Sequence, residues 1–283
     1  MLLAGPDIIT PHISDSHAID YPCFHPGFVC EAALPRWAPI HLGPLTLDMS
    51  PTKHVVWLGI AALLCVITLI AAARAHARTT FGGKRAPSGL GNGMEAFVLF
   101  LRNEVVVPNV GPHGDAFTPL ILTLFFFILF ANLCGLIPYG ATATGNIAVT
   151  GTLAVITFIV VEIAGMRAQG AAYLGTIFYW PHDVPFAVKA PMTLIMTPVE
   201  IVGKFTKPFA LAIRLFANMT AGHVVLLALI GLIFTFQSYL IAPAPLLMAV
   251  AISLLELFVS LLQAFIFSLL AAVFIGQIRT AAH

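Results

Sequence analysis

The sequence predicts an all-α polytopic membrane protein. Among its 283 residues, 59% are hydrophobic and only 9% are charged, whereas soluble domains carry about 25% charged residues. Several apolar runs reach or approach the roughly 20 residues that cross a bilayer as a helix. The net charge of +1 is too small for a nucleic-acid-binding protein, which needs a basic surface. We therefore predict about five membrane-embedded helices, one amphipathic helix at the membrane interface, and no nucleic-acid partner.

Residues 1–52 are predicted to form an extramembrane N-terminal arm, and residues 53–283 the membrane domain. The arm is rich in Pro and His and carries five of the twelve acidic residues. Cys23 and Cys30 lie in this arm and could form a disulfide in an oxidising compartment. No cysteine pair has the spacing to histidines that a zinc site needs, so we expect no metal and no other cofactor.

The first three membrane spans follow from apolar runs of helical length. They are predicted at residues 55–73, 118–137 and 147–168. The link between the second and third spans is short and rich in Gly and Thr, so these two spans should form an antiparallel pair. Before them, residues 94–107 place apolar side chains at helical spacing among Glu95, Arg102 and Glu104. That mixture predicts the amphipathic helix at the membrane interface.

The last third of the chain predicts two helices that are too long for simple spans. They are expected at residues 191–236 and 246–278, separated by the Pro-rich residues 242–245. They would be roughly 69 Å and roughly 50 Å long, whereas the hydrocarbon core is about 30 Å thick. The two must therefore be strongly tilted, broken or extended beyond the membrane. Pro198 and Pro208 are the candidate kink points.

The distribution of basic residues predicts the orientation in the membrane. If the arm lies outside and the spans alternate, most Lys and Arg residues fall on the inner side. The outer side then keeps only Arg36 and Lys53. We therefore expect the N-terminus outside and the C-terminus inside.

Arg214 is the most informative polar residue, because it lies in the middle of an apolar run. A guanidinium keeps its proton at any physiological pH, and holding it at bilayer depth costs at least about 2.5 kcal/mol. An arginine in that place therefore predicts a functional site. Asn218 falls on the same helical stripe, about 40° away. Gln263, near the centre of the last helix, should lie at a similar depth because the two helices run antiparallel.

A histidine and a glutamate are predicted at one depth, on the outer side of the arginine. His223 lies roughly 13 Å outward of Arg214, and Glu256 roughly 10 Å outward of Gln263. Histidine titrates near neutral pH, so the two together predict a proton relay open to the outside. On an ideal helix His223 points about 180° away from Arg214. The relay and the arginine would then serve different surfaces.

Two carboxylates lie toward the inner side. Glu200 falls on the Arg214 stripe, fourteen residues inward, and Glu162 lies in the inner part of the third span. Either could line an inner aqueous path for protons. Alternatively, Glu162 is a structural partner, and Glu200 forms an ion pair with Lys204 four residues later on the same helix.

The run from Pro208 to His223 resembles subunit a of the rotary (F-type) ATP synthases, a stator component of the membrane sector. Three further segments match the same family: NLCGLIPY at 132–139, IAVT at 147–150 and LLQAFIF at 261–267. Together these segments cover most of residues 95–280 in the order that the family shows. The N-terminal arm is not covered well.

The resemblance implies a stator subunit that carries protons but catalyses no reaction by itself. Its partners would be a ring of c subunits, the b subunits of the peripheral stalk, protons and the lipid bilayer. Arg214 would be the stator arginine that faces the c-ring, and the long hairpin would be tilted against that ring. Asn218 and Gln263 would flank the arginine, while His223 and Glu256 would belong to the outer of two offset half-channels.

The resemblance also implies a location in the cell and shows which members of the family the chain is most similar to at two positions. The chain would be a multi-pass protein of the bacterial inner membrane with a cytoplasmic C-terminus. Mitochondrial-type members lie in the inner mitochondrial membrane. Some bacterial members carry a carboxylate at the position of His223 and a histidine at that of Glu256. Here the two are exchanged, as in mitochondrial-type members.

A different class of protein is the alternative. In a stand-alone secondary transporter, Arg214 would bind an anionic substrate. The missing inverted repeat argues against this alternative. Co-purification with c and b subunits would distinguish the two. An intramembrane enzyme is disfavoured because the spans contain no nucleophile–base pair and no metal-ligand motif.

Overall fold

The computed structural model describes most of the chain, namely residues 14–22, 29–43, 45–81, 90–111, 114–137, 140–177, 185–236 and 242–280. In these residues, 5 helices are long and apolar enough to cross a membrane. This result confirms the predicted all-α polytopic fold class. The division into an arm and a membrane domain stays a prediction.

The elements belong to two compact units, each assembled from segments that are far apart in the sequence. Unit 1 comprises Met1–Thr68, Phe126–Val149 and Leu215–Ala264. Unit 2 comprises Leu69–Phe125, Thr150–Arg214 and Phe265–His283. The boundaries fall inside long helices, so a single helix contributes residues to both units.

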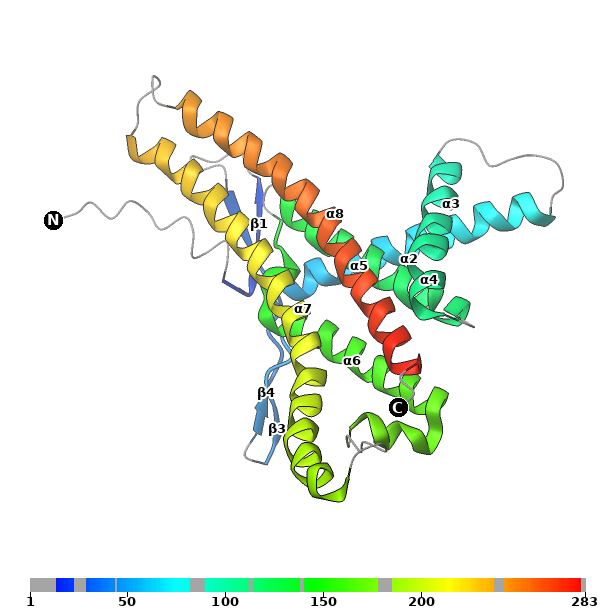
Figure 1. The fold of residues 1–283 in the computed structure, drawn as a ribbon. Coiled ribbons are helices and arrows are strands. Elements are labelled where there is room, and N and C mark those ends of the chain that lie inside the picture. Colours follow the sequence, from blue (N-terminus) through cyan, green and yellow to red (C-terminus); the bar gives the residue numbers. More distant parts are fainter. Residues whose placement is uncertain are drawn as a thin grey trace. The chain divides into compact units, whose positions relative to one another are not determined.

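The first three candidate spans are α2 (Lys53–Phe81), α5 (Thr118–Leu136) and α6 (Ile147–Gln169), which Figure 1 labels. Helix α5 is almost entirely apolar on all faces, as expected for a helix surrounded by lipid and protein. Pro119 lies in its first turn, where the missing N–H has no partner to lose. The helix ends before Pro138, whose ring disfavours a helical conformation in the residue before it.

The two long helices are α7 (Phe186–Phe236) and α8 (Pro243–Thr280). Helix α7 continues without a break for 51 residues although it contains Pro191, Pro198 and Pro208. The helix is therefore not broken, and a kink at Pro198 or Pro208 stays a prediction. At 1.5 Å per residue α7 is about 77 Å long, more than twice the thickness of the hydrocarbon core. The strong tilt of the hairpin stays a prediction.

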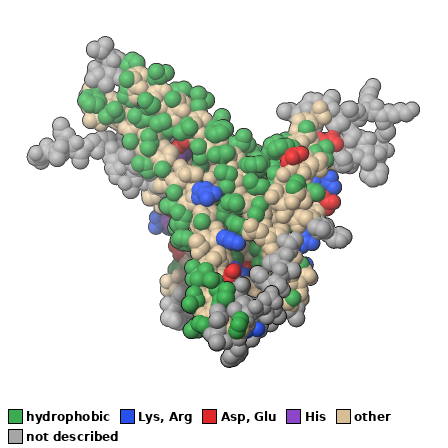
Figure 2. All heavy atoms as spheres, in the orientation of Figure 1, with side chains coloured by type: hydrophobic (Ala, Val, Ile, Leu, Met, Phe, Trp, Pro, Cys, Tyr) green, Lys and Arg blue, Asp and Glu red, His purple; other side chains and the backbone are tan. Residues whose placement is uncertain are grey.

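Helix α8 exposes many large apolar side chains in unit 1. Leu247, Leu254 and Phe258 are 74%, 64% and 60% exposed, and Figure 2 shows hydrophobic side chains spread over this helix. Soluble monomers rarely expose apolar patches of this extent. The surface is therefore suited to contact with lipid or with another subunit.

The predicted amphipathic helix runs from α3 (Leu90–Phe100) through a π-helical turn, η1 (Leu101–Val106), into α4 (Val107–Val110). Its buried side chains include Leu101 and Val105, whereas Glu104 is exposed, so the segment is amphipathic. The π turn lies just before Pro108, which cannot donate the backbone hydrogen bond of a regular helix. Just after it, Asn109 Nδ2 donates a hydrogen bond of 2.7 Å to the carbonyl of Val105.

The N-terminal arm contains two short antiparallel hairpins that the sequence analysis did not predict. Strand β1 (Ala18–Pro22) pairs with β2 (Val29–Ala33), and β3 (Ile40–Leu42) pairs with β4 (Leu45–Leu47). Cys23 lies outside the described residues, so the disulfide with Cys30 stays a prediction.

The arm is anchored to the first turn of α2. The backbone N–H of Lys53 donates to the carbonyl of Ser16 at 2.9 Å. His54 Nδ1 lies 2.8 Å from Asp15 Oδ1, and the same oxygen accepts a bond from the backbone N–H of His54. A carboxylate at a helix N-terminus satisfies a free N–H group and interacts favourably with the helix dipole.

Candidate functional site

His223 and Glu256 contact each other in unit 1, as the sequence analysis expected. His223 Nδ1 lies 3.8 Å from Glu256 Oε1, and the two side chains are only 18% and 7% exposed. Residues 215–236 of α7 and 243–264 of α8 lie side by side here (Figure 1). A separation of 3.8 Å is too long for a direct hydrogen bond. It leaves the two side chains close to each other without a direct bond.

Thr142 is a third member of this cluster, and it was not predicted. Its Oγ1 lies 3.2 Å from His223 Nε2, so the imidazole has Thr142 at one nitrogen and Glu256 at the other. Thr142 belongs to the segment between α5 and α6. That segment is held by a buried hydrogen bond of 2.6 Å from Thr144 Oγ1 to Asn132 Oδ1. The asparagine of the NLCGLIPY motif thus helps to hold the loop that carries Thr142.

Two glycines permit these close contacts. A Cβ added at Gly222 would collide with the carboxylate of Glu256, and a Cβ added at Gly135 would collide with the hydroxyl of Thr142. A side chain at either position would push the polar groups apart. The clustering of Thr142, His223 and Glu256 therefore depends on glycine at positions 135 and 222.

Asn218 and Gln263 also meet in unit 1. Asn218 Nδ2 donates a hydrogen bond of 3.1 Å to Gln263 Oε1, and Gln263 is only 2% exposed. The sequence analysis expected Gln263 at the depth of Arg214, and the partner observed is Asn218, four residues further along α7. The hydrogen bond cross-links α7 and α8 close to the arginine in the sequence.

Arg214 is exposed on α7 in unit 2. No hydrogen bond or ion pair joins its guanidinium to any residue that the structure describes in that unit. Its charge is therefore not neutralised by a carboxylate within the described part of unit 2.

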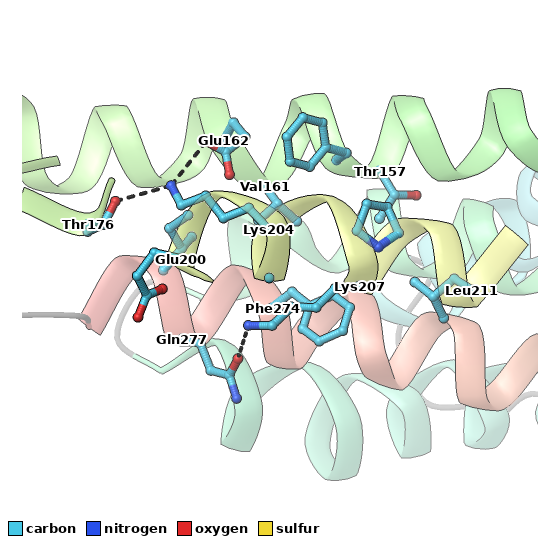
Figure 3. Close-up of a pocket in the computed structure, with 14 residues that line it drawn as sticks. Thr157, Val161, Glu162, Thr176, Glu200, Lys204, Lys207, Leu211, Phe274 and Gln277 are labelled. Atoms are coloured by element: carbon cyan, nitrogen blue, oxygen red, sulfur yellow. Dashed lines mark hydrogen bonds and ion pairs between the residues drawn. The ribbon is translucent and has the colours of Figure 1, made fainter. Parts of the chain in front are cut away.

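A pocket in unit 2 gathers the polar side chains that the sequence analysis placed toward the inner side (Figure 3). Its cavity has a volume of about 180 Å³. The charged side chains that line it are Glu162, Glu200, Lys204 and Lys207. Lys207 Nζ donates to Gln277 Oε1 at 3.3 Å. The remaining wall is largely apolar, so these few groups determine its chemistry.

Lys204 has three oxygen partners for its three ammonium protons. Its Nζ lies 3.4 Å from Glu162 Oε2, 3.1 Å from the Tyr173 hydroxyl and 3.2 Å from Thr176 Oγ1. The ammonium also lies 4.5 Å from the centre of the Tyr173 ring, within cation–π range. Lys204 therefore joins α7 to α6 and to the 3₁₀ turn η4 (Gly170–Thr176).

The alternative ion pair between Glu200 and Lys204 is not formed. Lys204 pairs with Glu162, and Figure 3 shows the Glu200 carboxylate turned away from the ammonium. Glu200 is exposed, and it makes no hydrogen bond or ion pair within the part of unit 2 that the structure describes. Among the described residues, no cluster of three or more His, Cys, Asp or Glu could hold a metal ion.

Comparisons with known proteins show the family of the chain. The sequence profile of the ATP synthase A chain family matches residues 55–276. The chain belongs to this family. ATP synthase subunit a of Chloroherpeton thalassium is 45% identical over 266 residues, which are 94% of this chain and 74% of that protein.

Two further relatives extend the comparison. ATP synthase subunit a 2 of Chlorobaculum tepidum is 45% identical over 239 residues, 84% of this chain and 62% of that protein. ATP synthase subunit a of Anaeromyxobacter dehalogenans (strain 2CP-C) is 44% identical over 273 residues, 95% of this chain and 69% of that protein. The resemblance to subunit a is thereby confirmed.

Every site residue that the sequence analysis predicted lies within the region that matches the ATP synthase A chain family. Thr142, Tyr173 and Thr176 lie there too, but the sequence analysis did not name them, and it named Glu162 without its partner Lys204. Gly222, which directly precedes His223, was a usable signal, because small residues permit close helix contacts in membranes. The oxygen partners of Lys204 lie 28 to 42 residues away, beyond the reach of helical periodicity.

Proposed function

We propose that this chain is the proton-translocating stator subunit of the membrane sector of an ATP synthase and catalyses no reaction by itself. The observation that carries the proposal is Arg214. It is a permanent cation in an apolar helix, exposed and without a carboxylate partner among the described residues of its own unit, in a chain of the ATP synthase A chain family. Membership of this family also argues against a stand-alone transporter.

Arg214 acts on a carboxyl group that a rotating c subunit carries through the membrane plane. A fixed positive charge favours the ionised form of an approaching carboxyl group. The carboxyl therefore releases its proton on the inner side and passes the arginine as an anion. The same charge repels protons and prevents a direct leak between the outer and inner half-channels. Asn218 and Gln263 flank this position and hold α7 against α8.

His223, Glu256 and Thr142 form the outer half-channel in this proposal. A proton from outside is taken up by the imidazole of His223 or the carboxylate of Glu256, 3.8 Å apart. The Thr142 hydroxyl holds the second imidazole nitrogen at 3.2 Å, which fixes the orientation of the ring. From this pair the proton continues to the c subunit.

Glu200 is the better candidate for the inner half-channel. Its carboxylate lines the pocket of unit 2 without an ion-pair partner in the described part of that unit. Glu162 is engaged by Lys204 at 3.4 Å and serves to hold that lysine. We therefore assign proton release to Glu200 and a structural role to Glu162.

The proposal includes partners and a location. The partners are the c-ring, the b subunits, protons and the surrounding lipid. The chain lies in the bacterial inner membrane with its N-terminus outside and its C-terminus in the cytoplasm, as the distribution of basic residues predicts. Purification supports this assignment if the chain is recovered together with c and b subunits.

We predict that Glu256→Gln and His223→Ala each slow proton uptake from the outside by about tenfold or more, because a positioned proton-transfer group contributes roughly 10²–10⁴-fold. The measurement is ATP synthesis by the reconstituted complex, driven by a pH gradient, as a function of the outer pH. The dependence on outer pH near neutrality should flatten in both variants. Unchanged pH profiles in both would contradict the relay.

We predict that Glu200→Gln slows proton release on the inner side, whereas Glu162→Gln does not when activity is expressed per assembled complex. An amide at position 162 still offers Lys204 an oxygen, but an amide at position 200 cannot take up a proton. The rate is measured against inner pH at constant outer pH. Equal losses in the two variants would refute the separate roles.

A further inference from the structure

The last part of the N-terminal arm, just before α2, carries large apolar side chains on its surface. Trp37, Ile40 and Met49 are 59%, 50% and 63% exposed. All three belong to unit 1, as does the first turn of α2 at Lys53. Large apolar side chains gathered on one exposed segment mark a contact with a membrane or with another protein. The arm therefore has a surface that the described fold leaves uncovered.

Two hydrogen bonds hold Trp37 beside the beginning of the first membrane span. The backbone N–H of Trp37 donates to Ser50 Oγ at 2.9 Å, and the Ser50 hydroxyl donates to the carbonyl of Trp37 at 3.4 Å. Ser50 is buried, and it lies three residues before Lys53, where the candidate span begins. Three residues of chain reach at most about 11 Å. Trp37 and Met49 therefore lie close to the level at which α2 enters the bilayer.

The hairpin of β3 and β4, which Figure 1 labels, lies between Trp37 and Ser50 in the chain. In an antiparallel pair, opposite residues share a face and successive residues alternate between faces. The register therefore separates apolar positions on one face from a more polar pair on the other: Ile40 opposite Leu47, Leu42 opposite Leu45, and His41 opposite Thr46. A two-stranded hairpin is at best marginally stable in water. Covering the Ile40 face would stabilise it.

The residue types of this segment are those of the lipid headgroup region. Tryptophan is enriched there because its ring is apolar and its N–H donates a hydrogen bond. The segment also carries the charges of Arg36 and Asp48, which are costly in the hydrocarbon core. Arginine pairs well with phosphate, and Asp48 Oδ1 accepts a hydrogen bond of 2.9 Å from the backbone N–H of Ser50. The composition thus fits the surface of a bilayer and not its interior.

We propose that residues 36–50 form an interfacial anchor that lies on the bilayer surface at the Lys53 end of α2. The Trp37 ring and the Ile40 face of the hairpin rest on the headgroup ends of the acyl chains. The Arg36 guanidinium contacts lipid phosphates, and the His41 face meets water. Because Ser50 ties this anchor to the beginning of α2, the anchor fixes the depth at which that helix enters the membrane.

The test measures the depth of Trp37 in the full chain by fluorescence quenching, which does not depend on proton transport. The chain has three tryptophans, so Trp57→Phe and Trp180→Phe leave Trp37 as the only one. The protein is reconstituted into phosphatidylcholine vesicles that carry bromine on the acyl chains, either near the headgroup or near the chain end. We expect stronger quenching by bromine near the headgroup, and only weak quenching by iodide in the water.

Ile40→Gln and His41→Gln are the matched pair of variants, because they place the same side chain on opposite faces of the hairpin. Ile40→Gln should lower the quenching of Trp37 by bromine and raise the quenching by iodide, whereas His41→Gln should change neither. Trypsin gives a second readout, since Arg36 is the only Lys or Arg among residues 1–52. Cleavage after Arg36 should be faster in Ile40→Gln than in His41→Gln.

Three results would overturn the inference. Quenching of Trp37 by iodide but not by bromine would show that the segment projects into water. Quenching by neither would show that protein covers the ring. Equal quenching in Ile40→Gln and His41→Gln would show that the Ile40 face makes no lipid contact. If the variants do not fold, a map of the unmodified complex in lipid nanodiscs decides, and a hairpin packed on another subunit or standing away from the lipid refutes the anchor.

Discussion

Arg214→Ala is expected to abolish proton-driven ATP synthesis by the assembled complex. Without the cation, the ionised form of an approaching c-subunit carboxyl group is no longer favoured. The carboxyl group therefore does not release its proton on the inner side before it passes position 214. The loss should reach at least about a hundredfold, as for removal of one preorganised charge-stabilising group. Vesicles with this variant should also leak protons, because nothing separates the two half-channels.

The control for this variant is a cation removed elsewhere. Arg36→Ala deletes the same charge from the exposed part of the arm and should leave synthesis unchanged. Arg214→Lys keeps the charge but loses the planar guanidinium, so we expect partial activity at most. The readouts are ATP synthesis driven by a pH gradient and passive proton flux in the same vesicles. A normal rate of ATP synthesis by the Arg214→Ala complex would contradict the proposed role of the arginine.

Lys204→Met is expected to reduce strongly the amount of assembled complex. The substitution leaves the carboxylate of Glu162 without its cation in an enclosed site. Breaking one side of a buried ion pair costs roughly 3–5 kcal/mol. We expect about 2–3 kcal/mol here, because the two side chains retain 16% and 19% exposure. Recovered complex and its thermal midpoint in detergent measure the effect.

The double variant Lys204→Met/Glu162→Leu tests the cause of that loss. Replacing both members of a buried ion pair by apolar residues is often neutral or stabilising. The double variant should therefore recover most of the stability that Lys204→Met loses. Tyr173→Phe, which keeps the ring under the ammonium but removes its hydroxyl, should have a small effect. The stability losses of the single variants Lys204→Met and Glu162→Leu are measured as well. If the loss of the double variant equals their sum, Lys204 and Glu162 are not coupled.

Contacts between the long helices were partly predictable from the sequence. His223 meets Glu256 as expected, and Gln263, expected at the depth of Arg214, bonds to Asn218 four residues further along α7. Both expectations followed from helical rise and antiparallel direction, which hold for any straight pair of helices. The roles assigned to these residues in transport stay predictions.

Other features depended on information that no short stretch of sequence contains. The pairing of Lys204 with Glu162 joins residues 42 positions apart, and it replaced the local pair with Glu200. Thr142 reaches His223 across 81 positions. Helical periodicity relates residues on one helix, but it does not determine which loop or neighbouring helix packs against them.

The sequence by itself determined the membrane class, the long apolar helices and the family, because hydropathy and a specific arginine motif are local properties of the chain. Only the tertiary structure decided which polar groups are neighbours. That choice depends on how closely backbones approach, and here Gly222 and Gly135 permit the approach. The partners of Lys204 became visible for the same reason, since burial and pairing are properties of packed segments.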